Sequence, residues 1–165
     1  MARPIINLAD VALRDHRQGD KYEAKLGRIG AMIGGQKLGC QLHVVPPGKS
    51  AFPCHVHHVN EEMVLVLDGE GTYRCGTDIY PVKAGDVISA PAGDVERPHQ
   101  MINSSEKELR YLVFSTRLDP EVVEYPDSGK FAVSSMVPPD KGLLGARLAY
   151  IGRKENSLDY WDGET

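Results

Sequence analysis

The sequence predicts an all-β protein, either a sandwich or a barrel of short strands. From about residue 23 onward, short runs rich in Val, Ile, Leu and Tyr alternate with Gly, Pro, Asp and Asn. Such turn signals at intervals of about 8–12 residues are typical of all-β sandwiches and barrels. No long amphipathic helix pattern is present. With 165 residues, 41% of them hydrophobic, the chain is long enough to bury one core.

Each strand is expected where an apolar run lies between two turn signals. The first residues mix charges with short apolar pieces, and 10–17 are expected to form a short helix with Asp10 as its N-cap. The predicted strands are 25–33, 39–45, 51–56, 62–67, 71–75, 78–82, 87–90, 97–103, 109–116 and 131–136. Residues 125–130 are predicted to form a turn, and 143–151 to add a strand or to pack across the barrel.

We expect a single domain over residues 1–165, made of an N-terminal arm (1–24), a barrel core (25–118) and a C-terminal extension (119–165). The extension is expected to pack on the barrel or on a partner subunit. Tyr160 and Trp161 lie near the C-terminus. Large aromatic side chains are usually buried, so these two are expected against their own core or against a neighbouring subunit.

Composition excludes several classes of function. The formal net charge is −4 and no segment clusters Lys and Arg, so nucleic acid is not an expected partner. No run approaches the roughly 18 apolar residues of a membrane span, and the N-terminus lacks the apolar core of a secretory signal. The three cysteines form no Cys-x-x-Cys pair, which argues against a disulfide framework or a thiolate zinc site. We therefore expect a cytoplasmic protein with reduced thiols.

Residues 54–69 contain the strongest functional signal. Successive side chains alternate faces in a strand, so His55 and His57 point the same way while His58 points the other way. Two imidazoles with a carboxylate from the next strand would form most of a nitrogen and oxygen metal site. Glu62 is one candidate for that carboxylate, and His99 is a candidate for a further ligand. Strand alternation does not separate Glu62 from Glu61, because both faces of the run that follows are apolar.

The spacing of these residues resembles the two motifs of the cupin family. The first motif is a Gly, five or six residues, His-x-His, three or four residues, Glu, six residues and Gly. The second motif is a Gly, five residues, Pro-x-Gly, two residues, His, three residues and Asn. The matching positions are Gly48, His55, His57, Glu62 and Gly69, and then Gly85, Pro91, Gly93, His99 and Asn103. Five residues (94–98) stand between Gly93 and His99, where the family pattern has two.

Shorter strings narrow the resemblance. The residues around Cys40, the 125–130 turn and the C-terminal Tyr160-Trp161-Asp162-Gly163 are similar to a bacterial subgroup of small single-domain cupins. The resemblance implies a double-stranded β-helix, the jelly-roll barrel of that family. It also implies a site in which His55, His57, Glu62 and His99 hold one divalent transition metal inside the barrel. Zn, Fe, Mn, Ni and Cu all suit such ligands.

Two functions are consistent with this interpretation. The first is a metalloenzyme of the dioxygenase, isomerase or decarboxylase type that acts on a small oxygenated or acidic molecule. Glu61 and Tyr73 are candidates for moving protons, and Arg97 is a candidate for selecting carboxylates or phosphates at the mouth. The alternative is a non-catalytic module that binds or senses a sugar or a small acid. Exposed sheet edges are commonly covered by pairing, so a homodimer is expected.

Overall fold

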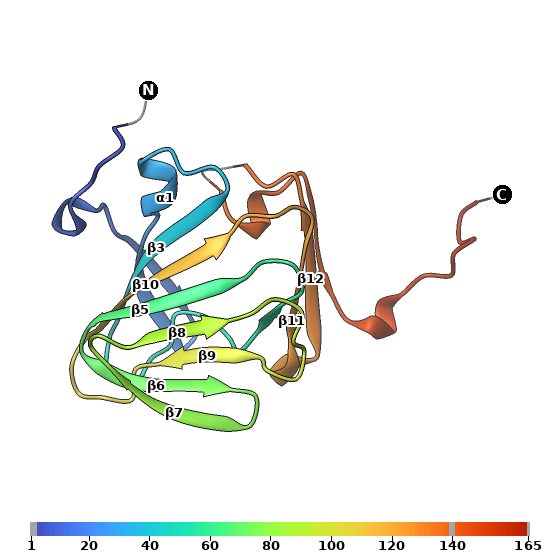
Figure 1. The fold of residues 1–165 in the computed structure, drawn as a ribbon. Coiled ribbons are helices and arrows are strands. Elements are labelled where there is room, and N and C mark those ends of the chain that lie inside the picture. Colours follow the sequence, from blue (N-terminus) through green and yellow to red (C-terminus); the bar gives the residue numbers. More distant parts are fainter. Residues whose placement is uncertain (1–2, 139–140, 165) are drawn as a thin grey trace.

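The computed structural model describes residues 3–138 and 141–164, and strands build the body of the molecule (Figure 1). The strands are β1 (Arg14–Gln18), β2 (Tyr22–Gly27), β3 (Leu38–Val45), β4 (Val56–His57), β5 (Glu62–Asp68), β6 (Glu70–Cys75), β7 (Asp78–Lys83), β8 (Val87–Ala90), β9 (His99–Ile102), β10 (Leu109–Thr116), β11 (Glu121–Tyr125), β12 (Lys130–Ser135) and β13 (Leu148–Gly152). The helices are short: α1 (Ile29–Met32) and the 3-10 turns η1 (Leu8–Asp10), η2 (Pro126–Ser128), η3 (Leu143–Gly145) and η4 (Lys154–Asn156). The predicted all-β fold is confirmed.

Three antiparallel sheets enclose a common interior. Their strand orders are β1-β2-β3-β10-β5-β8, β13-β12-β11-β4 and β7-β6-β9. Strands far apart in sequence pair side by side, as β3 does with β10 and β6 does with β9. In Figure 1, β11 and β12 stand across the end of the barrel beside β5, β8 and β9. These crossovers are typical of the jelly-roll barrel, which is the double-stranded β-helix that the sequence motifs predicted.

The main sheet separates two hydrophobic cores. The inner core fills the barrel and includes Val45, Val64, Val66, Leu109 and Tyr111. The outer core lies on the other face of the sheet and contains Val11, Ile29, Leu42, Val44 and Leu112. Neighbouring residues of one strand therefore enter different cores, which follows from the alternation of side chains along a strand.

The outer core explains why β5 is apolar on both faces. Val64 and Val66 belong to the inner core, while Leu67 packs against the outer core. Glu62 shares the inward face with the two valines because it is two residues before Val64. Glu61 is exposed. The sheet thus places Glu62, the carboxylate at the motif position, inside the barrel.

The N-terminal prediction was wrong. Residues 10–17 were expected to form a helix, but the chain has only the short turn η1 there and then enters β1, which pairs with β2. Tertiary pairing with an available sheet edge overrides the weak helical preference of this segment. The strand predicted over 25–33 ends earlier than expected, because β2 stops at Gly27. Helix α1 follows, and its first residue, Ile29, packs in the outer core.

The predicted strand 51–56 is mostly irregular. Only Val56 and His57 form a strand, which pairs with β11. Pro53 cannot donate a backbone hydrogen bond to a sheet. Ala51 and Cys54 are nevertheless fully buried, so the apolar signal in this segment reflected burial rather than strand pairing.

Gly69 shows why the first motif ends in glycine. Its φ is +82°, and a Cβ at this position would lie 2.4 Å from the carbonyl oxygen of Glu108. A side chain is thus excluded both by backbone conformation and by a neighbouring backbone. This tight turn connects β5 to β6, which belong to different sheets.

The C-terminal segment has two parts. Residues 121–135 form β11 and β12, of which the sequence predicted only the second, and β13 pairs with β12. Beyond β13 the chain leaves the barrel as an extended arm (Figure 1). Leu158, Tyr160 and Trp161 on this arm are 76%, 83% and 68% exposed, so the expectation that the two aromatic residues pack on their own core is wrong. In the described part of the chain, no helix is long and apolar enough to cross a membrane.

Candidate metal centre

Two histidines far apart in sequence meet through their backbones. His55 and His99 form an isolated antiparallel bridge, in which each amide N–H donates to the other residue's carbonyl, at 3.0 and 2.7 Å. Their imidazole ring centroids lie 4.6 Å apart. The side chain of His55 is fixed by a 2.8 Å contact between its Nδ1 and the carbonyl oxygen of Pro53. That contact makes Nδ1 the protonated nitrogen and leaves the lone pair of Nε2 available to a ligand.

Glu62 completes a compact group with these two histidines. Its Oε2 lies 3.3 Å from Nε2 of His99. One potential ligand atom from each of His55, Glu62 and His99 falls within 4.8 Å of those of the other two. The three come from the segment before β4, from β5 and from β9, so only the closed barrel brings them together.

His57 lies at the edge of this group. Its Nε2 is 3.7 Å from Oε1 of Glu62, and its Nδ1 is 3.4 Å from Oε2 of Glu121. His57 is outside the cluster formed by His55, Glu62 and His99. His58 points the other way and pairs with Glu124 at 2.9 Å, as strand alternation predicted.

Glu121 is a buried carboxylate that anchors His57. Its oxygens accept hydrogen bonds from the backbone N–H groups of Val59, Asn60 and Val122, at 3.1, 3.0 and 2.9 Å. The side-chain amide of Asn60 also donates to it. A carboxylate held in this way fixes the ring orientation of the adjacent histidine, as outer partners of metal-binding histidines commonly do.

The protonation states suit a cation. Burial lowers the pKa of His55 to about 4, so its ring is neutral at pH 7. Burial alone would raise the pKa of Glu62, but the hydrogen bond from His99 and the nearby His57 and His55 lower it to about 2. For His57, burial acts to lower the pKa, and the contacts with Glu121 and Glu62 outweigh it and raise the pKa. An ionised carboxylate therefore faces at least one neutral imidazole.

The donor atoms fit a bound transition metal. Nitrogen and oxygen ligands bind such ions at about 2.1 Å, so neighbouring donors on one ion lie about 3.0–4.2 Å apart. The 3.3 Å His99–Glu62 and 3.7 Å His57–Glu62 separations both fall in this range. Nδ1 of His57 is buried and, among the described residues, has no well-formed hydrogen bond. The arrangement thus supports His55, Glu62 and His99 as a core of three donors, with His57 beside them.

An apolar cavity of about 290 Å³ lies on one side of Glu62. Its walls are mainly aromatic and aliphatic, and they include His43, Phe52, Tyr73, Met101 and Tyr111. The Tyr73 ring stacks against His99 with centroids 6.0 Å apart. The Tyr73 hydroxyl is buried without a hydrogen-bond partner among the described residues, and burial raises its pKa. Of the three predicted catalytic residues, Tyr73 alone lines this cavity.

The other two predicted catalytic residues lie elsewhere. Glu61 is exposed, and its backbone N–H donates to Oγ1 of Thr116. Arg97 is exposed and its Nε lies 3.4 Å from Sγ of Cys75. Both side chains are outside the two cavities that border Glu62.

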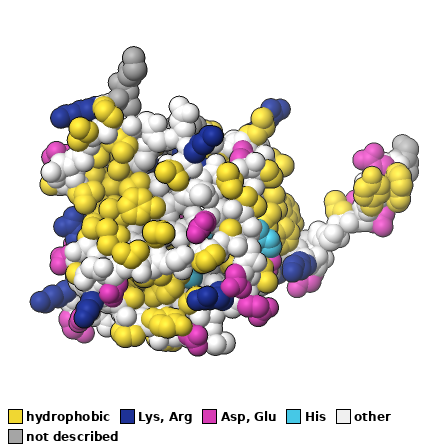
Figure 2. Space-filling view, in the orientation of Figure 1, with side chains coloured by type: hydrophobic (Ala, Val, Ile, Leu, Met, Phe, Trp, Pro, Cys, Tyr) yellow, Lys and Arg dark blue, Asp and Glu magenta, His cyan; other side chains and the backbone are white. Residues whose placement is uncertain are grey.

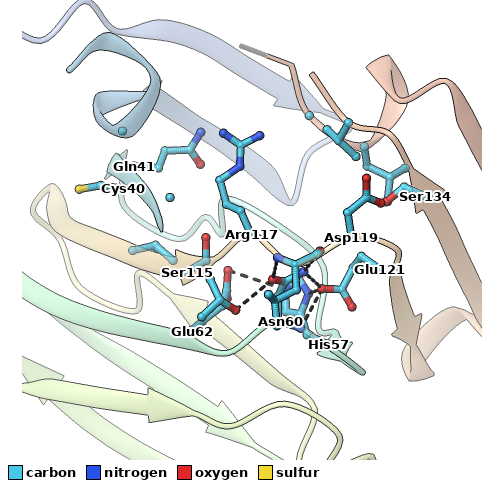
Figure 3. Close-up of a pocket in the computed structure, with 18 of the residues that line it drawn as sticks. Cys40, Gln41, His57, Asn60, Glu62, Ser115, Arg117, Asp119, Glu121 and Ser134 are labelled. Atoms are coloured by element: carbon cyan, nitrogen blue, oxygen red, sulfur yellow. Dashed lines mark hydrogen bonds and ion pairs between the residues drawn. The ribbon is translucent and has the colours of Figure 1, made fainter. Parts of the chain in front are cut away.

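A second cavity, of about 370 Å³, lies on the other side of Glu62 (Figure 3). His57 and Glu62 line both cavities, so the candidate ligands form part of the boundary between them. Arg28, Arg117 and Lys141 are among the residues that line this second cavity. Figure 3 shows Arg117 rising from the end of its strand on the α1 side, above Glu62 and Asn60.

The five residues between Gly93 and His99 do not displace the histidine. Gly93 N–H donates to the His57 carbonyl at 2.8 Å, and the loop closes on itself through a 3.0 Å bond from Arg97 N–H to the Asp94 carbonyl. The extra residues therefore form a turn outside the ladder. Asn103, the last residue of the second motif, is fully buried and donates to the carbonyls of Val45 and Lys107.

Sequence reasoning missed Glu121 and the three cations of the second cavity. Glu121 precedes the short Val122-Val123 pair, and neither its burial nor its contact with His57 has a local signal. Arg28, Arg117 and Lys141 belong to separate segments that no motif connects. The Val122-Val123 pair was the one available hint that a strand passes behind the site.

Comparisons with known proteins agree with this geometry. A family model described as a cupin domain matches residues 41–115. Residues of this chain are 55% identical to (S)-ureidoglycine aminohydrolase of Arabidopsis thaliana, but over 31 residues, which are 19% of this chain and 10% of that enzyme.

Solved structures share almost the whole fold. A proposed sugar phosphate isomerase from Acidithiobacillus ferrooxidans is 23% identical with a TM-score of 0.77, and the match covers 95% of this chain and 96% of the other. A sugar phosphate isomerase from Silicibacter pomeroyi also has 23% identity and a TM-score of 0.77, with 96% and 98% covered. The two motifs and the barrel topology agree with the family model, so residues 41–115 carry a cupin domain.

Proposed function

We propose that this protein is a metal-dependent enzyme that acts on a small oxygenated or acidic molecule. The observation that carries the proposal is the cluster of His55, Glu62 and His99 in the apolar cavity, with an ionised carboxylate and a neutral imidazole facing each other. Glu62 also lines the second cavity. His57 would complete the set of ligands, held by Glu121. A bound divalent transition ion supplies Lewis-acid polarisation of a substrate oxygen.

The protein itself orients the substrate and excludes water. The aromatic wall of the apolar cavity would take the carbon skeleton, and the Tyr73 hydroxyl, which lacks a partner, would donate a hydrogen bond to a substrate oxygen. The raised pKa of Tyr73 keeps its proton in place at neutral pH. Two proteins with this fold are described as sugar phosphate isomerases, so we take isomerisation of small phosphorylated sugars as the first activity to test, before decarboxylation and dioxygenation.

Metal content tests the proposal directly. Tag-free protein purified without added metal should contain about one equivalent of a transition metal by inductively coupled plasma mass spectrometry. His99→Ala and Glu62→Gln should each lose most of it while keeping the fold, because each removes a donor from a small set. His58→Ala is the matched control, since its side chain pairs with Glu124 away from the cluster. Full metal content in both site variants would refute the ligand assignment.

One observation favours the alternative of a non-catalytic binding module. Glu61 is exposed outside both cavities, so it does not face a bound substrate. Burial raises the pKa of Tyr73, so its hydroxyl is a poor proton acceptor at neutral pH. A binding module would saturate with a sugar or a small acid and return it unchanged. Product analysis of the metal-loaded protein with phosphorylated sugars separates the two functions.

We further propose a homodimer in which two copies exchange their C-terminal arms. Hydrophobic side chains gather on the outer face of β10, β5 and β8, where Met63, Phe114 and Val87 are exposed (Figure 2). The arm of the same chain exposes Tyr160 and Trp161 away from its own barrel. A two-fold pairing of arm and face would bury both surfaces reciprocally. The full chain should sediment at twice 18.1 kDa, and deleting residues 158–165 should give a monomer slightly lighter than 18.1 kDa. A monomeric full-length protein at micromolar concentration would contradict this.

A further inference from the structure

Three cationic side chains from separate segments line the second cavity. Arg28 lies between β2 and α1, Arg117 follows β10, and Lys141 precedes η3. The same cavity reaches His57 and Glu62, so it opens directly onto the candidate metal ligands. Cationic side chains from different parts of a chain that line one cavity favour an anionic ligand.

One backbone contact positions Arg117, and two glycines border the side chains of Arg28 and Lys141. Nη2 of Arg117 donates to the Pro138 carbonyl at 3.4 Å, and its backbone N–H donates to the Lys37 carbonyl at 2.9 Å. A Cβ on Gly142 would lie 3.3 Å from Nη2 of Arg28. A Cβ on Gly145 would lie 2.7 Å from both Cβ and Cδ of the Lys141 side chain. The two glycines thus leave the room that these cationic side chains occupy.

The carboxylates of the cavity already have partners. Glu62 contacts His57 and His99, Glu121 accepts from backbone N–H groups, and Oδ2 of Asp119 accepts from the Met136 backbone N–H at 2.6 Å. Among the described lining residues, the three cationic side chains balance these three carboxylates in formal charge. A divalent ion on the candidate ligands would then leave two positive charges, which a dianion neutralises.

We propose that this cavity binds the phosphate group of a small phosphorylated substrate, with Arg117, Arg28 and Lys141 as its ligands. A guanidinium fork pairs bidentately with phosphate oxygens, and a phosphate monoester supplies the two negative charges that a single carboxylate lacks. The cavity volume of about 370 Å³ matches a small-molecule site. This inference rests on the proposed function, because it places the reacting end of the substrate at the metal and its phosphate end at the cations.

The arrangement couples the two sites. Metal binding adds positive charge at Glu62, and phosphate binding adds negative charge in the adjoining cavity, so each should raise the affinity for the other. The coupling must be reciprocal, because both affinities belong to one thermodynamic cycle.

Isothermal titration with inorganic phosphate at fixed ionic strength tests the site. Metal-loaded Arg117→Gln should bind phosphate at least about tenfold more weakly than wild type, because a hydrogen bond to a charged group is lost. Arg28→Gln and Lys141→Gln should each weaken it as well. Arg153→Gln, which removes the same charge from the exposed start of the arm, should leave it unchanged. Acetate should bind far more weakly than phosphate.

The outcomes separate this inference from the proposed function. Metal content should be full in all four variants, so a variant that loses metal reports on the metal centre rather than on the anion site. Equal phosphate affinity in Arg117→Gln and Arg153→Gln, or acetate binding as tight as phosphate, would overturn the anion site even if the protein holds metal. If Arg117→Gln does not fold by circular dichroism, Arg28→Gln and Lys141→Gln decide by the same comparison.

Discussion

The two cavities that border Glu62 share part of their lining, including His57 and Val113, but differ in the residues that line the rest. One is walled by Phe52, Tyr73 and Tyr111 and buries neutral rings, while the other is walled by charged groups from three loops. The apolar cavity is built from β3, β6, β9 and β10, whose alternation fixes which side chains enter. The cationic residues of the second cavity lie outside the strands, as Arg28 does after β2 and Arg117 does after β10.

This difference shows how one barrel can orient an asymmetric small molecule. A ligand with an apolar or hydroxylated end and an anionic end has one favourable direction across Glu62, because the reversed direction would bury a charge among aromatic rings. Glu62 and His57 line both cavities, so the reacting atoms would be those between the two ends of the ligand.

The largest effect is expected on the free energy of unfolding, when acid protonates a histidine in the wall of the apolar cavity. Burial lowers the pKa of His43 to about 4, and in the unfolded chain a histidine titrates near about 6.5. The unfolded state therefore binds more protons between these values, so stability is fully present above about pH 6.5 and is lost as pH falls toward 4. The loss attributable to His43 is about 3 kcal/mol.

Denaturant unfolding of metal-free protein at pH 7.5 and 4.5 measures that loss. His43→Gln should show a smaller decrease in the free energy of unfolding than wild type, and His55 contributes equally to both proteins. His16→Gln, at the half-buried edge of β1, is the control. The same acid sensitivity in His43→Gln and wild type would show that the apolar cavity does not keep this ring neutral.

The next largest effect is expected on metal affinity, from the loss of the Glu121 carboxylate that contacts His57. Glu121→Gln keeps the shape of the side chain but removes the charge that faces Nδ1 of His57. If His57 is a ligand, metal affinity should fall about 10–100-fold, as it does when outer partners of ligating histidines are lost. Competition with a chromogenic chelator measures the affinity.

Glu124→Gln is the matched control for that experiment. Glu124 lies on the same strand but contacts His58 rather than the candidate ligands. Similar affinities for the Glu121 and Glu124 variants would assign metal binding to His55, Glu62 and His99 alone.

The smallest effect on stability is expected from Tyr73→Phe. The Tyr73 hydroxyl is buried without a partner among the described residues, so its removal should change the free energy of unfolding by less than about 1 kcal/mol, or raise it. If the hydroxyl bonds a substrate oxygen, ligand affinity or turnover should fall all the same. A variant that is destabilised by several kcal/mol would show that the hydroxyl is satisfied in the free protein.

The sequence predicted the fold where strand alternation and turn residues agreed. Strands β8 and β10 begin and end at the predicted residues, and β5 extends one residue beyond its prediction. Strand prediction failed where residues are buried without pairing in a sheet. Ala51 and Cys54, for example, are buried in an irregular segment. It also failed at β1, whose polar residues form a strand because the edge of β2 is available.

Some residues of the candidate site were predicted from the sequence, and others were found only in the folded structure. The resemblance of the motif spacing to the cupin motifs predicted His55, His57, Glu62 and His99 as one group, and the structure brings three of them, His55, Glu62 and His99, close together. Only the tertiary structure decided that Glu62 rather than Glu61 faces inward, since an outer core makes both faces of β5 apolar. It alone brought Glu121 to His57 and gathered Arg28, Arg117 and Lys141 around one cavity. Those contacts join strand ends that are distant in sequence, so they depend on how the barrel closes rather than on any local pattern.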